Sequence, residues 1–85
     1  MTPEQGKEAL SILRARGGRL TMATMTDGRV FRIMNIAWGR DEGADFDHVT
    51  ANVSPPIPGF SVDFFRKDEL LTLMAEGGEE LFNSN

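Results

Sequence analysis

The feature that most constrains this chain is the pair Asp27-Gly28, which lies between two runs of extended character. Both central residues of a type I′ turn need positive φ, and Asp-Gly is one of the pairs that favour it. A two-residue β-hairpin is therefore expected here. We predict its strands over residues 19–26 and 29–38.

The register of this hairpin decides which side chains share a face. A two-residue turn pairs Thr24 with Phe31 and Ala23 with Arg32. Because side chains alternate along a strand, Trp38 is expected on the same face as Arg32. Both faces of the predicted hairpin are partly apolar.

The start of the chain predicts an amphipathic helix over residues 3–16. Thr2 can cap it, Pro3 suits the first helical position, and Gln5 can complete a capping box. Apolar residues recur at helical spacing, namely Ala9, Leu10, Ile12 and Leu13. The glycine pair at 17–18 is expected to end the helix.

The second half of the chain predicts two more strands and a second helix. Alternating apolar residues indicate strands over residues 46–53 and 60–65, and the proline-rich residues 54–59 form a semi-rigid connection between them. The apolar period then becomes helical and is followed by a glycine pair, so a helix is expected over residues 68–76. Residues 79–85 are expected to fray.

These elements define an α+β fold in a single domain of 85 residues: an N-terminal helix, a four-stranded antiparallel meander and a C-terminal helix. The alternative is a small Sm- or SH3-like β-barrel with an N-terminal helix. Residues 10–75, chiefly LTMATMTDGRVFRI and FSVDFFRKDEL, resemble the strand and turn order of such barrels. The chain also resembles the small acidic Sm-like inhibitors of the Rho termination factor.

Charge is divided unequally along the chain. Residues 1–40 contain seven basic and three acidic residues, a net charge of +4, whereas residues 41–85 contain two basic and ten acidic residues, a net charge of −8. Such a division suggests two electrostatically different surfaces.

The residue types argue against an enzyme. Cysteine is absent, which excludes disulfides and thiolate metal sites and favours a reducing compartment. No signal peptide or membrane-spanning apolar run is recognised, so a cytoplasmic location is expected. His48 is the only side chain whose ordinary pKa lies near neutrality, and catalytic, EF-hand and phosphate-binding motifs are not found. We therefore expect no catalysis, no cofactor and no metal.

The first functional hypothesis is a non-catalytic protein-binding module. It would be a small acidic inhibitor or adaptor of phage or mobile-element type, similar to anti-CRISPR proteins in size and charge. The predicted contact residues are Trp38, Asp41, Glu42, Asp45 and Asp47. The expected partner is another protein, one with a basic surface that binds nucleic acid, because opposite charges favour encounter. No membrane partner is expected.

The alternative is an Sm-like or sheet-based nucleic-acid-binding module, in which arginines bind phosphates and Trp38 stacks on bases. The predicted arginines are Arg16, Arg19, Arg32 and Arg40. The acidic net charge argues against this alternative. Association of the basic half of one chain with the acidic half of another would give a homo-oligomer, which is compatible with either function.

Overall fold

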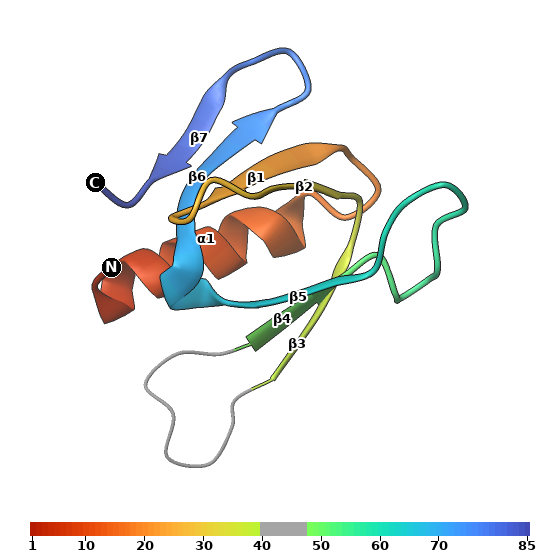
Figure 1. Ribbon diagram of the computed structural model, residues 1–85, viewed down its shortest axis with the longest axis horizontal. Coiled ribbons are helices and arrows are strands. Elements are labelled where there is room, and N and C mark those ends of the chain that lie inside the picture. The colour runs from red at the N-terminus through yellow and green to blue at the C-terminus, as the bar shows by residue number, and fades with distance from the viewer. Residues whose placement is uncertain (40–47) are drawn as a thin grey trace.

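The computed structural model describes residues 1–39 and 48–85 and contains two antiparallel sheets and an N-terminal α-helix (Figure 1). The elements are α1 (Pro3–Ala15), β1 (Thr21–Met25), β2 (Val30–Ile33), β3 (Ile36–Gly39), β4 (His48–Ala51), β5 (Asp63–Arg66), the short 3₁₀ helix η1 (Lys67–Glu69), β6 (Leu70–Ala75) and β7 (Glu80–Asn83). One sheet has the order β2-β1-β6-β7 and the other has the order β3-β4-β5. The α+β class and the N-terminal helix are confirmed, but the expected single meander is divided between two sheets.

Helix α1 begins with the predicted capping box. The Gln5 N–H donates to Thr2 Oγ1 at 3.1 Å, and the Thr2 N–H donates to Gln5 Oε1 at 2.8 Å. These bonds satisfy backbone donors that the start of a helix otherwise leaves open. The buried residues of the helix are Gly6, Ala9 and Leu13, and the helix contacts η1 and β7.

The first hairpin forms at the predicted place with a different turn. Gly28 has a φ of 93°, and no other residue of this turn has positive φ. The Gly28 N–H donates to the Met25 carbonyl at 3.0 Å, and the Met25 N–H donates to the Arg29 carbonyl at 2.7 Å. The loop therefore has three residues and closes with a glycine bulge, as in three-residue hairpins built on a type I turn.

The longer loop shifts the hairpin register by one residue, so the predicted pairing is wrong. Ala23 pairs with Phe31 and not with Arg32. A shift of one residue moves every side chain of a strand to the other face. Ile33 is therefore buried in the core, while Val30 and Arg32 are exposed on the outer face.

The C-terminal helix expected over residues 68–76 is wrong. Its place is taken by η1 and by β6, which pairs with β1. The register of this pairing shifts at Leu71, which is an extra residue in β6. Because of this bulge, Leu70 and Leu73 are both buried although they are three residues apart, and their spacing imitates that of a helix.

The glycine pair at 77–78 closes a second hairpin. The Gly78 N–H donates to the Ala75 carbonyl at 2.9 Å, and the Ala75 N–H donates to the Glu79 carbonyl at 2.8 Å, the same arrangement as in the first hairpin. Strand β7 then pairs with β6 and buries Phe82. The expectation that residues 79–85 fray is therefore wrong.

The long strand expected over residues 29–38 is broken into β2 and β3, which belong to different sheets. Asn52, which is buried and has a φ of 66°, holds the break. Its Oδ1 accepts the Met34 N–H, and its Nδ2 donates to the carbonyl oxygens of Arg32 and Ser61, each at 2.8 Å. One side chain thus replaces the partners that the backbone loses at the bend.

A second buried amide, Asn35, ties the proline-rich segment to the same point. Its Nδ2 donates to the Pro55 carbonyl at 2.8 Å, and its Oδ1 accepts the Ser54 N–H at 3.1 Å. Its carbonyl also accepts the Asn52 N–H at 2.8 Å. The two asparagines therefore link both sheets to the connection between β4 and β5.

Apolar side chains from α1 and from both sheets form one core. Its buried residues are Ala9, Leu13, Ala23, Met25, Ile33, Val49, Ala51, Phe65, Leu70, Leu73 and Phe82. The described strands do not close into a barrel, so the Sm- or SH3-like alternative is not found in closed form. Within the described part of the chain, no helix is long and apolar enough to span a bilayer.

We predict that Asn52→Ala destabilises the protein by about 3 kcal/mol, because it leaves three backbone groups at a buried site without their partner. Denaturant unfolding measures the loss. The control is Asn83→Ala, which removes an exposed amide and should cost about 0.5 kcal/mol or less. Equal losses for the two variants would contradict the role assigned to Asn52.

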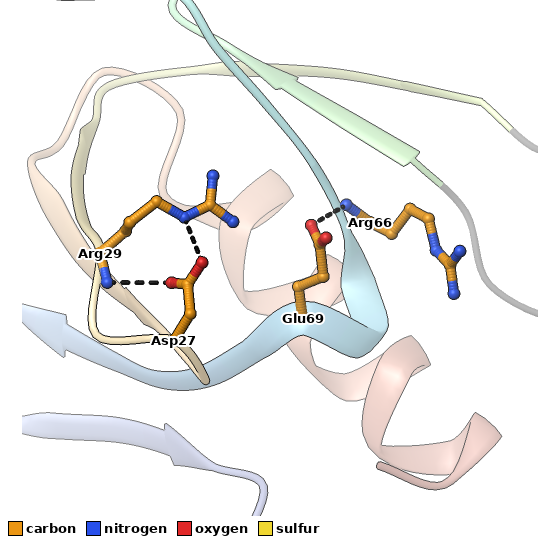
Figure 2. Close-up of polar contacts among 4 residues, drawn as sticks. All are labelled: Asp27, Arg29, Arg66 and Glu69. Carbon is orange, nitrogen blue, oxygen red and sulfur yellow. Dashed lines mark hydrogen bonds and ion pairs between the residues drawn. The ribbon is translucent and has the colours of Figure 1, made fainter.

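The turn of the first hairpin predicts that the stability of the protein depends on pH. The pKa of Asp27 is lowered from 3.8, chiefly because its carboxylate accepts the Arg29 N–H, and also because it accepts a bond from the Arg29 guanidinium (Figure 2). Since the folded-state pKa is the lower one, this stabilisation is present above the unfolded pKa and is lost as pH falls through the folded value. The melting temperature of the wild type should therefore exceed that of Asp27→Asn by an amount that shrinks as the pH is lowered, and a constant difference would refute this.

Candidate binding surface

The outer face of the β3-β4-β5 sheet carries an open aromatic side chain. The strand register places Phe64 beside Thr50, and places Phe65 in a row with Val49 and Trp38. Because side chains alternate along strands, the two rows face opposite sides of the sheet. Phe64 is 60% exposed, whereas Phe65 is 1% exposed.

His48 extends this aromatic area. Its ring stacks on Phe64, with the centroids 5.3 Å apart and the planes inclined by 30°. Gly39 makes room for the imidazole, because a Cβ at that position would lie 3.2 Å from His48 Nε2. Val62, just before β5, is also 60% exposed. We call the side chains of His48, Val62 and Phe64 the Phe64 surface.

Acidic neighbours hold Arg66 at the end of β5. Its guanidinium donates to the Asp68 carboxylate. Its backbone N–H donates to Glu69 Oε2 at 3.0 Å (Figure 2). These contacts fix the tight connection from β5 through η1 to β6. The positive charge of Arg66 is therefore balanced locally by Asp68.

Trp38 lies on the other face of the same sheet. The guanidinium carbon of Arg14 is 4.5 Å from the centre of its ring, and the side chain is 45% exposed. A hollow of about 210 Å³ adjoins it, lined by Leu13, Arg14, Gly17, Asn35, Ile36 and Trp38. Trp38 thus belongs to the α1 side of the molecule and not to the Phe64 surface.

Arg16 is buried, and its side chain makes hydrogen bonds within the fold. It is 9% exposed, its Nε donates to Thr21 Oγ1 at 2.7 Å, and its Nη2 donates to the Leu20 carbonyl at 2.9 Å. These bonds join the end of α1 to the start of β1. The side chain is occupied inside the fold.

Of the other arginines predicted for the nucleic-acid face, Arg32 does not stack on Trp38. The guanidinium carbon of Arg32 is 4.2 Å from the centre of the Phe60 ring, so the expected grouping of Arg32 with Trp38 is wrong. The break between β2 and β3, which puts Arg32 and Trp38 in different sheets, explains the difference. Arg19 is exposed, and Arg40 lies outside the described residues.

The acidic contact residues predicted from the sequence, Asp41, Glu42, Asp45 and Asp47, also lie outside the described residues. In the chain they connect Gly39 to His48, which face each other at the end of the β3-β4 pair. Their role in binding stays a prediction. Within residues 1–39 and 48–85, no group of three or more histidine or acidic side chains is placed to hold a metal.

In comparisons with known proteins, no family model matches the chain, and no curated protein and no solved structure matches it significantly. The function is therefore inferred from the residues of the surface.

The Phe64 surface was missed by the sequence reasoning, which treated Phe60, Val62 and Phe64 as one apolar face of a strand. The available signal was the adjacent pair Phe64-Phe65. Two neighbouring residues of a strand point to opposite faces, so one aromatic of such a pair lies away from the core.

We predict that alanine substitutions at Phe64 and Phe65 differ greatly in their cost to stability. Phe65→Ala should cost about 3–5 kcal/mol, because it leaves a cavity in the core. Phe64→Ala should cost about 0.5 kcal/mol or less, because the ring is largely exposed. Chemical unfolding of both variants checks the assignment, and a large loss for Phe64→Ala would show that this ring supports the fold.

Proposed function

We propose that the chain is a non-catalytic protein-binding module, a small acidic inhibitor or adaptor of phage or mobile-element type that acts in the cytoplasm. The observation that carries the proposal is the exposure of Phe64 and Val62, each at 60%. Side chains this open gain little from burial in the fold, whereas aromatic side chains are enriched at protein interfaces and contribute strongly there. The Phe64 surface is the proposed apolar part of the contact.

The charge distribution supports a basic partner. Residues 41–85 have a net charge of −8, and four of their acids fall within residues 41–47, which lead directly into His48. Opposite charges accelerate encounter and fix orientation more than they add affinity. A protein surface that binds nucleic acid carries the positive charge required. We therefore propose that Asp41, Glu42, Asp45 and Asp47 attract such a surface and that Phe64 anchors it.

Capture from a lysate of the source cells tests the proposal. The tagged wild-type chain is compared with Phe64→Thr and with the control Ser11→Ala, which alters an exposed side chain of α1. We expect capture of one protein that remains bound after nuclease treatment. Its recovery should fall about tenfold with Phe64→Thr, a loss of about 1.4 kcal/mol in binding, and should be unchanged with Ser11→Ala.

A separate charge-reversal variant tests the proposed electrostatic attraction between the acidic residues and the partner. Reversing Asp41, Glu42, Asp45 and Asp47 to lysine should reduce recovery of the same protein and weaken its dependence on salt. Recovery that stays at the wild-type level both with Phe64→Thr and with the reversed chain would refute the proposed surface. Material that disappears with nuclease would indicate nucleic-acid binding instead.

A further inference from the structure

A cavity of about 260 Å³ lies between the edge of β2 and the stretch of chain from Gly59 to Asp63, the first residue of β5. Its walls include Val30 and Arg32 on one side and Gly59, Phe60, Ser61 and Asp63 on the other. Strand β2 is at the end of its sheet, so within the described chain no strand pairs with it on the side away from β1. We call this cavity the β2 seam.

The hydrogen-bond pattern of the hairpin shows which backbone groups reach the seam. The Met25 N–H donates to the Arg29 carbonyl, which makes these two residues a hydrogen-bonded pair. Such pairs alternate along an antiparallel ladder, so the backbone groups of Val30 and Arg32 point away from β1. The Arg32 carbonyl follows this rule, because it accepts from Asn52 Nδ2 at 2.8 Å.

Asn52 closes one end of the seam. The same Nδ2 that reaches the Arg32 carbonyl also donates to the Ser61 carbonyl at 2.8 Å, so the amide bridges the two walls. It already binds the β2 edge as a neighbouring strand would. The other outward-facing backbone groups of β2, which are the N–H and C=O of Val30 and the N–H of Arg32, point into the seam.

We propose that the β2 seam binds an extended segment of a partner protein by strand addition, with an acidic residue opposite Arg32. Backbone donors and acceptors in this alternation are matched by another extended chain. The cavity is smaller than the roughly 300–1,000 Å³ that holds a drug-sized ligand, so it suits one or two side chains of a peptide.

Charge selects the residue opposite Arg32. The Arg32 guanidinium lies over Phe60, and within the described chain no carboxylate forms an ion pair with it. Opposite charges on directly facing positions of adjacent strands stabilise the pair, and like charges destabilise it. Glutamate or aspartate is therefore favoured at this position, and lysine is disfavoured.

The seam shares no residue with the Phe64 surface, so either site can fail while the other stands. The probe is the peptide acetyl-Thr-Val-Glu-Val-Thr-amide, titrated into the ¹⁵N-labelled full chain and followed by NMR. The amide signals of Val30, Arg32 and Ser61 should shift. A peptide with lysine in place of glutamate should bind about fivefold more weakly, and one with N-methylated backbone amides should not bind.

Two variants sharpen the test. Val30→Pro removes one N–H that faces the seam and none that pairs with β1, and proline is tolerated at such an edge position. It should weaken binding of the glutamate peptide about tenfold, whereas Val30→Thr, which keeps the N–H, should not. Arg32→Glu should reverse the preference between the two peptides.

Three results would overturn the proposal: no shifted signals at millimolar peptide, equal binding of the N-methylated peptide, or equal binding of the lysine peptide. If Val30→Pro fails to fold, the Arg32→Glu reversal and the N-methylated peptide still decide the question.

Discussion

Asn52 makes the hydrogen bonds on which the rest of this structure depends. A strand that leaves one sheet and enters another exposes backbone groups at the bend, and burying them unpaired costs about 1–3 kcal/mol each. Asn52 supplies the missing partners for Met34, Arg32 and Ser61 from a single side chain. Its positive φ places the amide there, and asparagine adopts that conformation more readily than most residues.

The bend that Asn52 holds also creates the two proposed sites. Because β3 does not continue in the sheet that contains β2, the β3-β4-β5 sheet has an outer face of its own. Phe64 is exposed on this face and stacks on His48. The same departure leaves the edge of β2 without a neighbouring strand. Both sites therefore follow from one change of direction.

Structure that depends on residues close in the sequence was predicted well. Predictions that depend on how distant strands pair were wrong. The capping box at Thr2 and Gln5 could be read from the sequence because all its atoms lie within one turn. The site of the first hairpin was also predicted, but two loop lengths are compatible with Asp27-Gly28, and the longer one shifts the register by one residue. The break between β2 and β3 then separates Arg32 from Trp38, although both would share one face of an unbroken strand. Strand β6 looked helical because a bulge gave Leu70 and Leu73 the spacing of a helix.

The fold places strands from the basic and the acidic halves of the sequence side by side. Strand β1 from the basic half pairs with β6 from the acidic half, and β3 pairs with β4. Several charges are also balanced close by, as in the pairs Arg29 with Asp27 and Arg66 with Asp68. What remains concentrated is the run of four acids in residues 41–47. We therefore propose that this segment supplies the acidic charge for partner recognition, whereas Phe64 supplies apolar contact and Arg32 supplies positive charge at the β2 seam.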